Sequence, residues 1–345
     1  MVPNAICIVA KCPIPGKSKT RLSAAAAGAT GLTDEGCALM AKAMLCDVLS
    51  IIHRAEELSS VVKFLYYAPA DEEGKQRMGS ILDELGICYV DGSQILEQAD
   101  RRPGILDNAG GPSGRGLDVL RNGKWYLSPM PGARQSNLRS SDLGKKLVGM
   151  YINTRSIVMN DFGVIDFETA TTPRSRTPPA VAFLGMDSPE LPVGEIAYAL
   201  QLASGPGSAY INPSHDGGYG MLCLPRRAPP TSVFEGVRWS DPLTAISQMK
   251  ALSDEGISVV IGSLMRDIDE VEDLMGLAER LRSAKKKNGL RSAKKKTGSA
   301  DEADKERGGD KLCRPPPGKD IEASTGNSDE DMCRYSWEAI QQLKI

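Results

Sequence analysis

The stretch that decides the fold of this 345-residue chain is AICIVAKCPIPGKSKTRL, at residues 5–22. Its first part, Ala5–Ala10, is wholly apolar and contains β-branched side chains, which is typical of a strand buried on both faces of a sheet. Two prolines and Gly16 follow, ahead of Lys19 and Arg21. Backbone amides beside a lysine and a guanidinium group suit a phosphate. We therefore expect a phosphate site directly after the first strand; the alternative is a basic surface turn.

Gly16-Lys17-Ser18 in the same loop resembles the end of a Walker A phosphate-binding loop. That motif requires a glycine five residues before Gly16, where this chain has Lys11. The sequence therefore excludes a P-loop nucleoside triphosphatase.

Helical and strand patterns alternate after this stretch. Thr33 is placed to cap one helix, and Gly86 is placed to end another. We expect helices at residues 33–57 and 71–85 and strands at residues 61–68 and 87–90. This β-α-β-α-β order predicts an α/β fold with a mainly parallel sheet and right-handed crossovers.

Two segments interrupt the pattern, at about residues 91–138 and 160–180. They are polar, rich in residues such as Pro, Ser, Thr and Arg, and lack periodicity, so we expect insertions. Around them we expect a helix from Ser141, helices at 193–203, 242–253 and 271–282, and strands at 181–186, 208–212, 219–224 and 257–261. These elements predict one domain over residues 1–281.

Charge separates the end of the chain from this domain. The whole chain has 42 Lys and Arg against 44 Asp and Glu, but residues 1–281 carry a net charge of −6 and residues 282–345 a net charge of +4. The hexapeptide RSAKKK occurs at 282–287 and again at 291–296, and few apolar residues follow until Trp337. Because this composition buries too little apolar surface to offset the entropy of ordering, we expect a disordered tail with a short helix at its end.

Residue usage also limits the kinds of site and the location. The eight cysteines include no CxxC pair and the chain has only two histidines, which excludes zinc ribbons and histidine-rich metal sites. The first apolar run is too short for a signal sequence or a membrane span. We therefore expect a cytoplasmic protein with no membrane contact.

Carboxylates follow two of the later strands. Asp187 ends the strand at 181–186, and open parallel sheets bind ligands at the carboxyl ends of their strands. A carboxylate there suits Mg²⁺ or Mn²⁺ shared with the phosphates of a substrate; the alternative is a turn cap before Ser188. Asp267 and Asp269 lie two residues apart, so both point to one side of an extended segment. One of them is placed to complete the metal site.

A glycine pair marks a further candidate. Gly217 and Gly218 follow Asp216, and glycines allow a backbone to pass close to a sugar or a base. The alternative is a hairpin turn at Asp216-Gly217.

Six motifs in order along the chain resemble a known family, DUF2064, also called radical-SAM/selenodomain-associated transferase 1. It belongs to the nucleotide-diphospho-sugar transferase (GT-A) superfamily. The motifs lie at residues 13–22, 142–144, 185–192, 216–222, 234–240 and 267–274. The resemblance implies a Rossmann-like GT-A fold, with three α/β/α layers around a mainly parallel sheet. One departure is Gly220, which replaces a second aromatic residue.

The resemblance also implies roles for individual residues. It implies a nucleotide and phosphate loop formed by Pro15, Gly16, Lys19, Thr20 and Arg21. It implies that Asp187 binds the metal and that Asp269 is a second carboxylate, acting as a ligand or a base. It places Asp216 on the acceptor or sugar side as a catalytic residue, with substrate contacts from Gly217, Gly218, Tyr219 and Trp239.

The function expected from these features is a metal-dependent transferase that uses a nucleotide-activated donor, as a glycosyltransferase acting on a nucleotide sugar. One alternative is a nucleotidyltransferase that uses an NTP, since the same loop and aspartates serve both reactions. A second alternative is a catalytically silent binding protein whose lysine-rich tail contacts nucleic acid. The sequence does not identify the acceptor.

Overall fold

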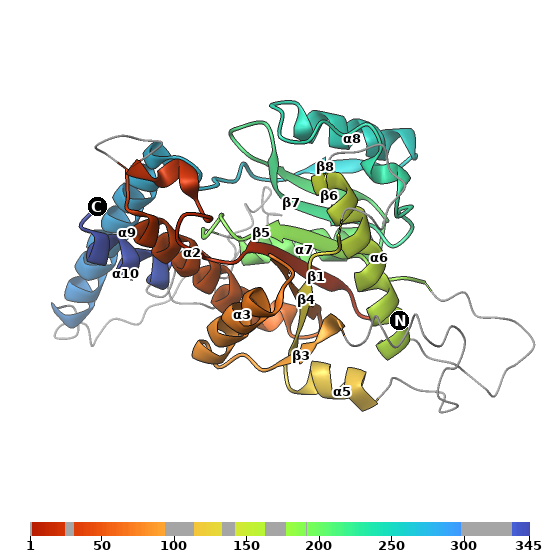
Figure 1. Cartoon of the computed structure of the whole chain (residues 1–345), viewed down its shortest axis with the longest axis horizontal. Helices are drawn as coiled ribbons and strands as arrows, with labels where there is room; N and C mark the ends of the chain where they lie inside the picture. Colours follow the sequence, from red (N-terminus) through yellow and green to blue (C-terminus); the bar gives the residue numbers. More distant parts are fainter. Residues whose placement is uncertain are drawn as a thin grey trace, which may run out of the picture.

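The computed structural model describes residues 2–24, 31–93, 114–132, 142–162, 177–190, 192–297 and 333–345. At its centre is one sheet with the strand order β3-β4-β2-β1-β5-β7-β6-β8 (Figure 1). The strands are β1 Ala5–Lys11, β2 Val62–Ala68, β3 Tyr89–Asp91, β4 Trp125–Pro129, β5 Val181–Gly185, β6 Ala209–Pro213, β7 Tyr219–Leu224 and β8 Val259–Ile261. Neighbouring strands are parallel except that β7 is antiparallel to β5 and β6. This confirms the predicted α/β fold with a mainly parallel sheet.

Helices cover both faces of the sheet and make three layers. Helices α2 Asp34–Arg54, α3 Glu72–Glu84 and α7 Val193–Ser204 pack on one face, and α5 Gly114–Arg121, α6 Asp142–Phe162 and α8 Thr244–Asp254 pack on the other. The central position of strand β1 explains why its sequence is apolar throughout. Ile6 and Ile8 belong to the apolar cluster of the first face, and Ala5 and Cys7 belong to that of the second. Side chains of a strand alternate between the faces, so a central strand needs apolar residues at every position.

Helix α2 begins as its sequence predicts. The Thr33 side chain accepts a hydrogen bond from the Gly36 N–H at 3.1 Å, which satisfies one free amide of the first turn. By length and composition alone this helix could cross a membrane. However, 72% of its most apolar stretch is buried inside the protein.

The segment predicted as the first insertion contains two regular elements, α5 and β4, so this prediction was wrong for residues 114–132. Strand β4 pairs with β2 on one side and β3 on the other. Its apolar part, Trp125–Leu127, is fully buried but only three residues long. So short a run between polar segments has no periodicity to detect. Residues 94–113 and 133–141, and most of the second predicted insertion (163–176), lie outside the described residues.

The predicted tail also differs from the structure. Helix α9, Val271–Thr297, continues past Arg282 through both RSAKKK repeats, because Ala, Lys and Arg are good helix formers and extend a helix that has already started. The expected terminal helix is present as α10, Arg334–Leu343. The part between them, 298–332, lies outside the described residues.

Helix α10 packs against α2 and α9, on the side of the molecule where Figure 1 shows all three. Ala339 and Ile340 are buried in a cluster with residues of those two helices. The carboxylate of Asp47, in α2, accepts the backbone N–H groups of Tyr335 at 2.9 Å and Ser336 at 2.8 Å. A buried carboxylate at the start of a helix satisfies amides that have no partner within the helix. The last segment is therefore part of the domain core.

We expect Ile340→Ala to lower the free energy of unfolding by about 2–5 kcal/mol, because truncating a fully buried side chain leaves a cavity. The exposed neighbour provides a matched control, since Gln341→Ala should change stability by less than about 0.5 kcal/mol. Urea unfolding followed by circular dichroism measures both. Equal effects of the two substitutions would show that α10 does not pack as described.

Lys63 is a buried cation within β2, and its side chain is used structurally. The residue is 4% exposed, and its Nζ donates to the carbonyl oxygens of Leu58 at 2.8 Å and Val61 at 3.4 Å. Burial lowers the pKa of Lys63 from its usual 10.5 to about 8. The folded protein therefore loses this proton at a lower pH than the unfolded chain does.

Because the folded-state pKa lies below the unfolded value, this group adds stability as the pH rises from about 8 toward 10.5, by up to about 3 kcal/mol. We expect Lys63→Met to remove that part of the pH dependence, and Lys250→Met, at an exposed lysine of α8, to leave it unchanged. Chemical unfolding at a series of pH values between 7 and 10 gives the slopes. A slope in Lys63→Met equal to that of the wild type would contradict the prediction.

Candidate functional site

The site lies where the connections of the sheet change direction. Strand β1 has β2 on one side and β5 on the other, so the loops after β1 and β5 leave the sheet in opposite directions. Open α/β sheets bind ligands at such a point, at the carboxyl ends of the strands. The carboxyl end of β8 reaches the same edge, because β8 is parallel to β6. The turn between β6 and β7 also reaches it, because β7 runs back antiparallel.

Backbone hydrogen bonds fix these segments relative to one another. The Ile268 N–H donates to the Asp187 carbonyl at 3.0 Å, and the Met265 N–H donates to the Pro213 carbonyl at 2.8 Å. The Ala245 N–H donates to the Gly217 carbonyl at 2.9 Å. The side chains carried by the loops after β5 and β8 therefore have set positions.

The loop after β1 is held together by Ser18. Its buried hydroxyl donates to the Cys12 carbonyl at 2.6 Å and accepts the Ile14 N–H at 2.9 Å. Lys19 then adopts a left-handed backbone conformation, with φ 49° and ψ 42°, at the start of the short 3₁₀ helix Thr20–Leu22. This conformation costs a residue other than glycine about 1–2 kcal/mol. Such strain persists where the surrounding structure fixes it, commonly at ligand sites.

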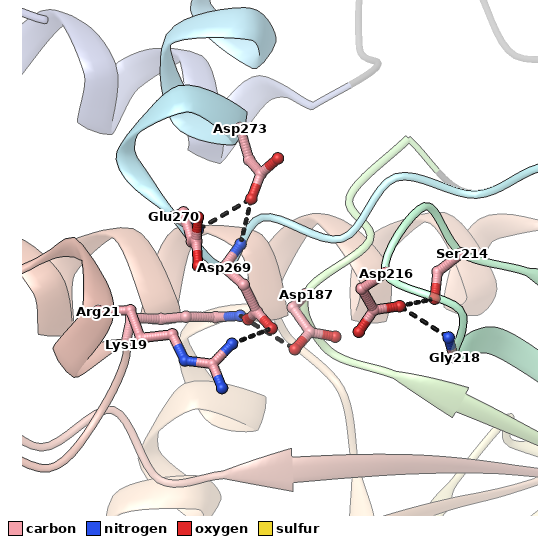
Figure 2. A network of polar contacts seen from close by, with 9 residues as sticks. All are labelled: Lys19, Arg21, Asp187, Ser214, Asp216, Gly218, Asp269, Glu270 and Asp273. Atoms are coloured by element: carbon pink, nitrogen blue, oxygen red, sulfur yellow. Dashed lines mark hydrogen bonds and ion pairs between the residues drawn. The ribbon is translucent and has the colours of Figure 1, made fainter. Parts of the chain in front are cut away.

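The Lys19 side chain points to two carboxylates on other loops (Figure 2). Its Nζ lies 3.0 Å from Asp187 Oδ2 and 2.6 Å from Asp269 Oδ1, and the side chain is 9% exposed. Arg21 Nη1 lies 3.7 Å from Asp269 Oδ2, but Arg21 is 69% exposed. Lys19 is therefore the inner cation of the site, and Arg21 is the outer one.

The pKa shifts of Lys19 and Asp269 follow from this pairing. Burial alone would lower the pKa of Lys19, but the charges of Asp187 and Asp269 outweigh it and raise that pKa. Burial alone would raise the pKa of Asp269, but the charge and hydrogen bond of Lys19, together with Arg21, lower it. Each group thus keeps the other ionised.

Asp187 is positioned by the Gly-Met-Asp sequence at the end of β5. A Cβ atom on Gly185 would lie 2.6 Å from Asp187 Oδ1, so only glycine leaves room for this carboxylate to fold back over the strand end. The sequence left open whether Asp187 merely caps a turn. In the structure its carboxylate contacts Lys19.

Asp267 belongs to the same carboxylate cluster as Asp187 and Asp269. This agrees with the expectation that Asp267 and Asp269 point to one side of an extended segment. The residue is half-buried, and burial together with the neighbouring charges of Asp216, Asp269 and Asp187 raises its pKa to about 6. Asp273 has a structural role instead. Its carboxylate accepts the backbone N–H groups of Asp269 at 3.1 Å and Glu270 at 2.9 Å, just before α9 begins.

The donor set suits a hard divalent cation. Four carboxylates gather here, and only Lys19 and Arg21 pair with any of them among the described residues. Carboxylate oxygens are the ligands that Mg²⁺ and Mn²⁺ prefer. Within the same described ranges no three Asp, Glu, His or Cys side chains already surround one point as a finished metal site. Between Asp187 and Asp269 that point is taken by the Lys19 ammonium.

Asp216 lies at the turn of the β6–β7 hairpin, as the alternative interpretation predicted. Its Oδ1 accepts from the Ser214 hydroxyl at 2.5 Å and from the Gly218 N–H at 2.8 Å (Figure 2). The charges of Asp216 and Asp187 both act on Asp267, so the turn also belongs to the carboxylate cluster. The hairpin interpretation is confirmed, and a role of Asp216 toward a sugar or acceptor stays a prediction.

The other predicted site residues lie in two places. Pro15, Gly16 and Thr20 are exposed in the loop around Lys19. Tyr219 and Trp239 pack against the apolar cluster below the hairpin, where the Tyr219 hydroxyl donates to Gln248 Oε1 at 3.3 Å. Substrate contacts from these two aromatic residues stay a prediction. The departure at Gly220 has a steric reason, because a Cβ there would lie 2.8 Å from Met265 Sδ.

A supporting network was not predicted from the sequence. Glu195 Oε1 accepts from Tyr210 Oη, Asn212 Nδ2 and the Ser263 N–H, each at 2.7 Å. This ties α7 to the segment that leads to Asp267, and a cavity of about 150 Å³ lies beside it, lined in part by Ser188 and Met265. The partners are up to 68 residues apart and share no local pattern, so no motif signals them.

Comparison with known proteins agrees with this architecture. Residues 152–241 match the family DUF2064, described as an uncharacterized protein conserved in bacteria. The solved structure of a proposed nucleotide-diphospho-sugar transferase from Desulfovibrio desulfuricans G20 has a similar fold. It is 18% identical, with a TM-score of 0.51, and the similarity covers 81% of this chain and 87% of that one. No curated protein matches the chain. The fold predicted from the six motifs is confirmed, and the match over residues 152–241 supports the predicted family.

The hairpin that carries Asp216 should depend strictly on Gly217. Its φ is +86°, and an added Cβ would lie 1.9 Å from the Pro242 carbonyl oxygen; Gly236 also has positive φ, +70°, but open space around it. We expect Gly236→Ala to cost about 1–2 kcal/mol of stability for its backbone alone. Gly217→Ala should cost about 1–3 kcal/mol more, because the Pro242 backbone must move. Unfolding midpoints in urea measure both, and equal losses would contradict the described packing.

Proposed function

We propose that this chain, with the DUF2064 motifs and the nucleotide-diphospho-sugar transferase fold, is a metal-dependent transferase that uses a nucleotide-activated donor. Our specific proposal is glycosyl transfer from a nucleotide sugar to an acceptor. One observation carries it: two cations of the loop after β1, Lys19 and Arg21, meet the carboxylates of Asp187 and Asp269 where the sheet connections diverge. A diphosphate with a divalent cation requires both kinds of group.

In this proposal the loop after β1 binds the diphosphate of the donor. Arg21 has an exposed guanidinium group that can form two parallel hydrogen bonds to phosphate oxygens. Lys19 adds a point charge, while Pro15, Gly16 and Thr20 shape the backbone around it. Gly16, with φ +70°, supplies a turn that other residues rarely adopt.

Asp187 and Asp269 are the residues we propose to hold Mg²⁺ or Mn²⁺. When bound, such a cation neutralises the charge that develops on the leaving diphosphate. Asp216 is the carboxylate we propose to receive the acceptor's proton. Its Oδ1 is already occupied by two hydrogen bonds, so Oδ2 is the atom placed for this transfer. Gly217 and Gly218 bring the backbone close to the sugar or acceptor, and Tyr219 and Trp239 support them from below.

The second candidate is nucleotidyl transfer from an NTP, which would use the same loop and carboxylates. The reactions differ in their products. Glycosyl transfer releases a nucleoside diphosphate from a nucleotide sugar, and nucleotidyl transfer releases pyrophosphate from an NTP. Pyrophosphate formation from an NTP, with nucleotide sugars left intact, would replace our proposal with the second candidate.

The binding step is tested by a thermal-shift screen of nucleotide sugars and NTPs with Mn²⁺. We expect Asp187→Ala to abolish the Mn²⁺-dependent stabilisation while the protein stays folded. Arg21→Ala should weaken the nucleotide that scores highest by about 1–3 kcal/mol, the usual contribution of one charge-assisted contact. Arg121→Ala, at an exposed arginine of α5, is the control and should have no effect. Full retention of Mn²⁺-dependent binding in Asp187→Ala would remove this residue from the site.

A further inference from the structure

We propose that Lys19 is a built-in counter-ion of the Asp187–Asp269 pair, and that it leaves these carboxylates when a donor diphosphate offers it another anion. This inference rests on the function proposed above and adds that cation binding and nucleotide binding depend on each other. Divalent cation and nucleotide should bind together, each weakly without the other.

The Lys19 ammonium group occupies the point between the two carboxylates. Lys19 Nζ lies between Asp187 Oδ2 and Asp269 Oδ1, at 3.0 Å and 2.6 Å. A magnesium ion needs such oxygens at about 2.0–2.1 Å, around the same point. An ammonium group and a divalent cation cannot both occupy that point, so Lys19 must move before these two carboxylates can hold a cation.

The backbone of the loop after β1 directs the Lys19 side chain inward. Lys19 has a left-handed backbone and a side chain that is 9% exposed, while Arg21, two residues later, is 69% exposed. The left-handed turn thus sends one cation into the cluster and leaves the other in solvent. A lysine that bound phosphate from an exposed position would not need this left-handed backbone conformation.

The carboxylate cluster also needs a compensating positive charge. Asp187 and Asp269 lie near Asp216 and Asp267, and with no cation between them the four carboxylates would repel one another. The nucleotide-free protein therefore needs an internal positive charge at this point. The lysine side chain suits the task, because its flexible stem lets the ammonium move while the backbone stays in place.

A diphosphate changes this balance because it brings anionic oxygens to the loop. Lys19 can then pair with phosphate instead of with the carboxylates, which frees Asp187 and Asp269 for a cation. By linkage, the nucleotide and the cation increase each other's affinity by the same factor.

The test measures binding of Mn²⁺ alone to the nucleotide-free protein, from the electron paramagnetic resonance signal of free Mn²⁺. We expect Lys19→Met to bind Mn²⁺ at least about tenfold more tightly than the wild type, although it has lost a polar group. Lys19→Gln is a second variant that keeps hydrogen bonding to the carboxylates, and it should change Mn²⁺ affinity in the same direction. Lys17→Met, at an exposed lysine of the same loop, is the matched control and should bind Mn²⁺ as the wild type does.

The same titration with UDP, GDP, CDP or ADP present measures the coupling. We expect the nucleotide that binds to increase Mn²⁺ affinity strongly in the wild type and by a clearly smaller factor in Lys19→Met. Unchanged or weaker Mn²⁺ binding in both Lys19 variants, beside measurable binding by the wild type, would overturn this inference and leave the proposed function intact. Absence of Mn²⁺ binding in every protein, with and without nucleotide, would overturn both.

Discussion

The ion pairs of Lys19 with Asp187 and Asp269 are the interaction that joins the loops of the candidate site. They join the loops after β1, β5 and β8, which belong to three separate parts of the sequence. A buried ammonium group is costly unless it is paired, and the partly exposed carboxylates of Asp187 and Asp269 supply that pairing. The pairing therefore favours the observed positions of the three loops in the nucleotide-free protein.

The rest of the sheet brings these loops together. Strands β1 and β5 are adjacent and parallel, so their carboxyl ends lie side by side. Because β7 is antiparallel to both β5 and β6, the β6–β7 connection lies at the same edge and places Asp216 there. With a wholly parallel arrangement, a hairpin could not reach this edge.

The parts of the site that could be predicted are those encoded locally. The buried strand and the Pro-Gly loop form one continuous stretch, and Gly185 with Asp187 forms another, so each could be recognised by its order and spacing. The resemblance to DUF2064 then joined them; the comparisons confirm the fold and support the family through a match over residues 152–241. The pairing of Lys19 with Asp187 and Asp269 could not be predicted, because these residues are 168 and 250 positions away.

Two errors have a similar cause. Strand β4 is defined by its neighbours β2 and β3, and its own three buried residues give too little pattern to identify it. The tail was judged by its average composition. That average hid the helix-forming RSAKKK repeats and the apolar residues of α10, which are stable because α2 and α9 cover them. In both cases distant contacts supply the stabilisation, and composition does not record them.

The sequence separation between Lys19 and Asp269 also affects the order in which parts of the protein fold. During synthesis the loop after β1 is made early, whereas Asp269, the partner of its Lys19, is translated 250 residues later. Contacts between residues so far apart close large loops and form slowly. The edge with the candidate site is therefore expected to be among the last parts to become native, and a chain that stops before β8 would have the centre of the sheet without the complete carboxylate cluster.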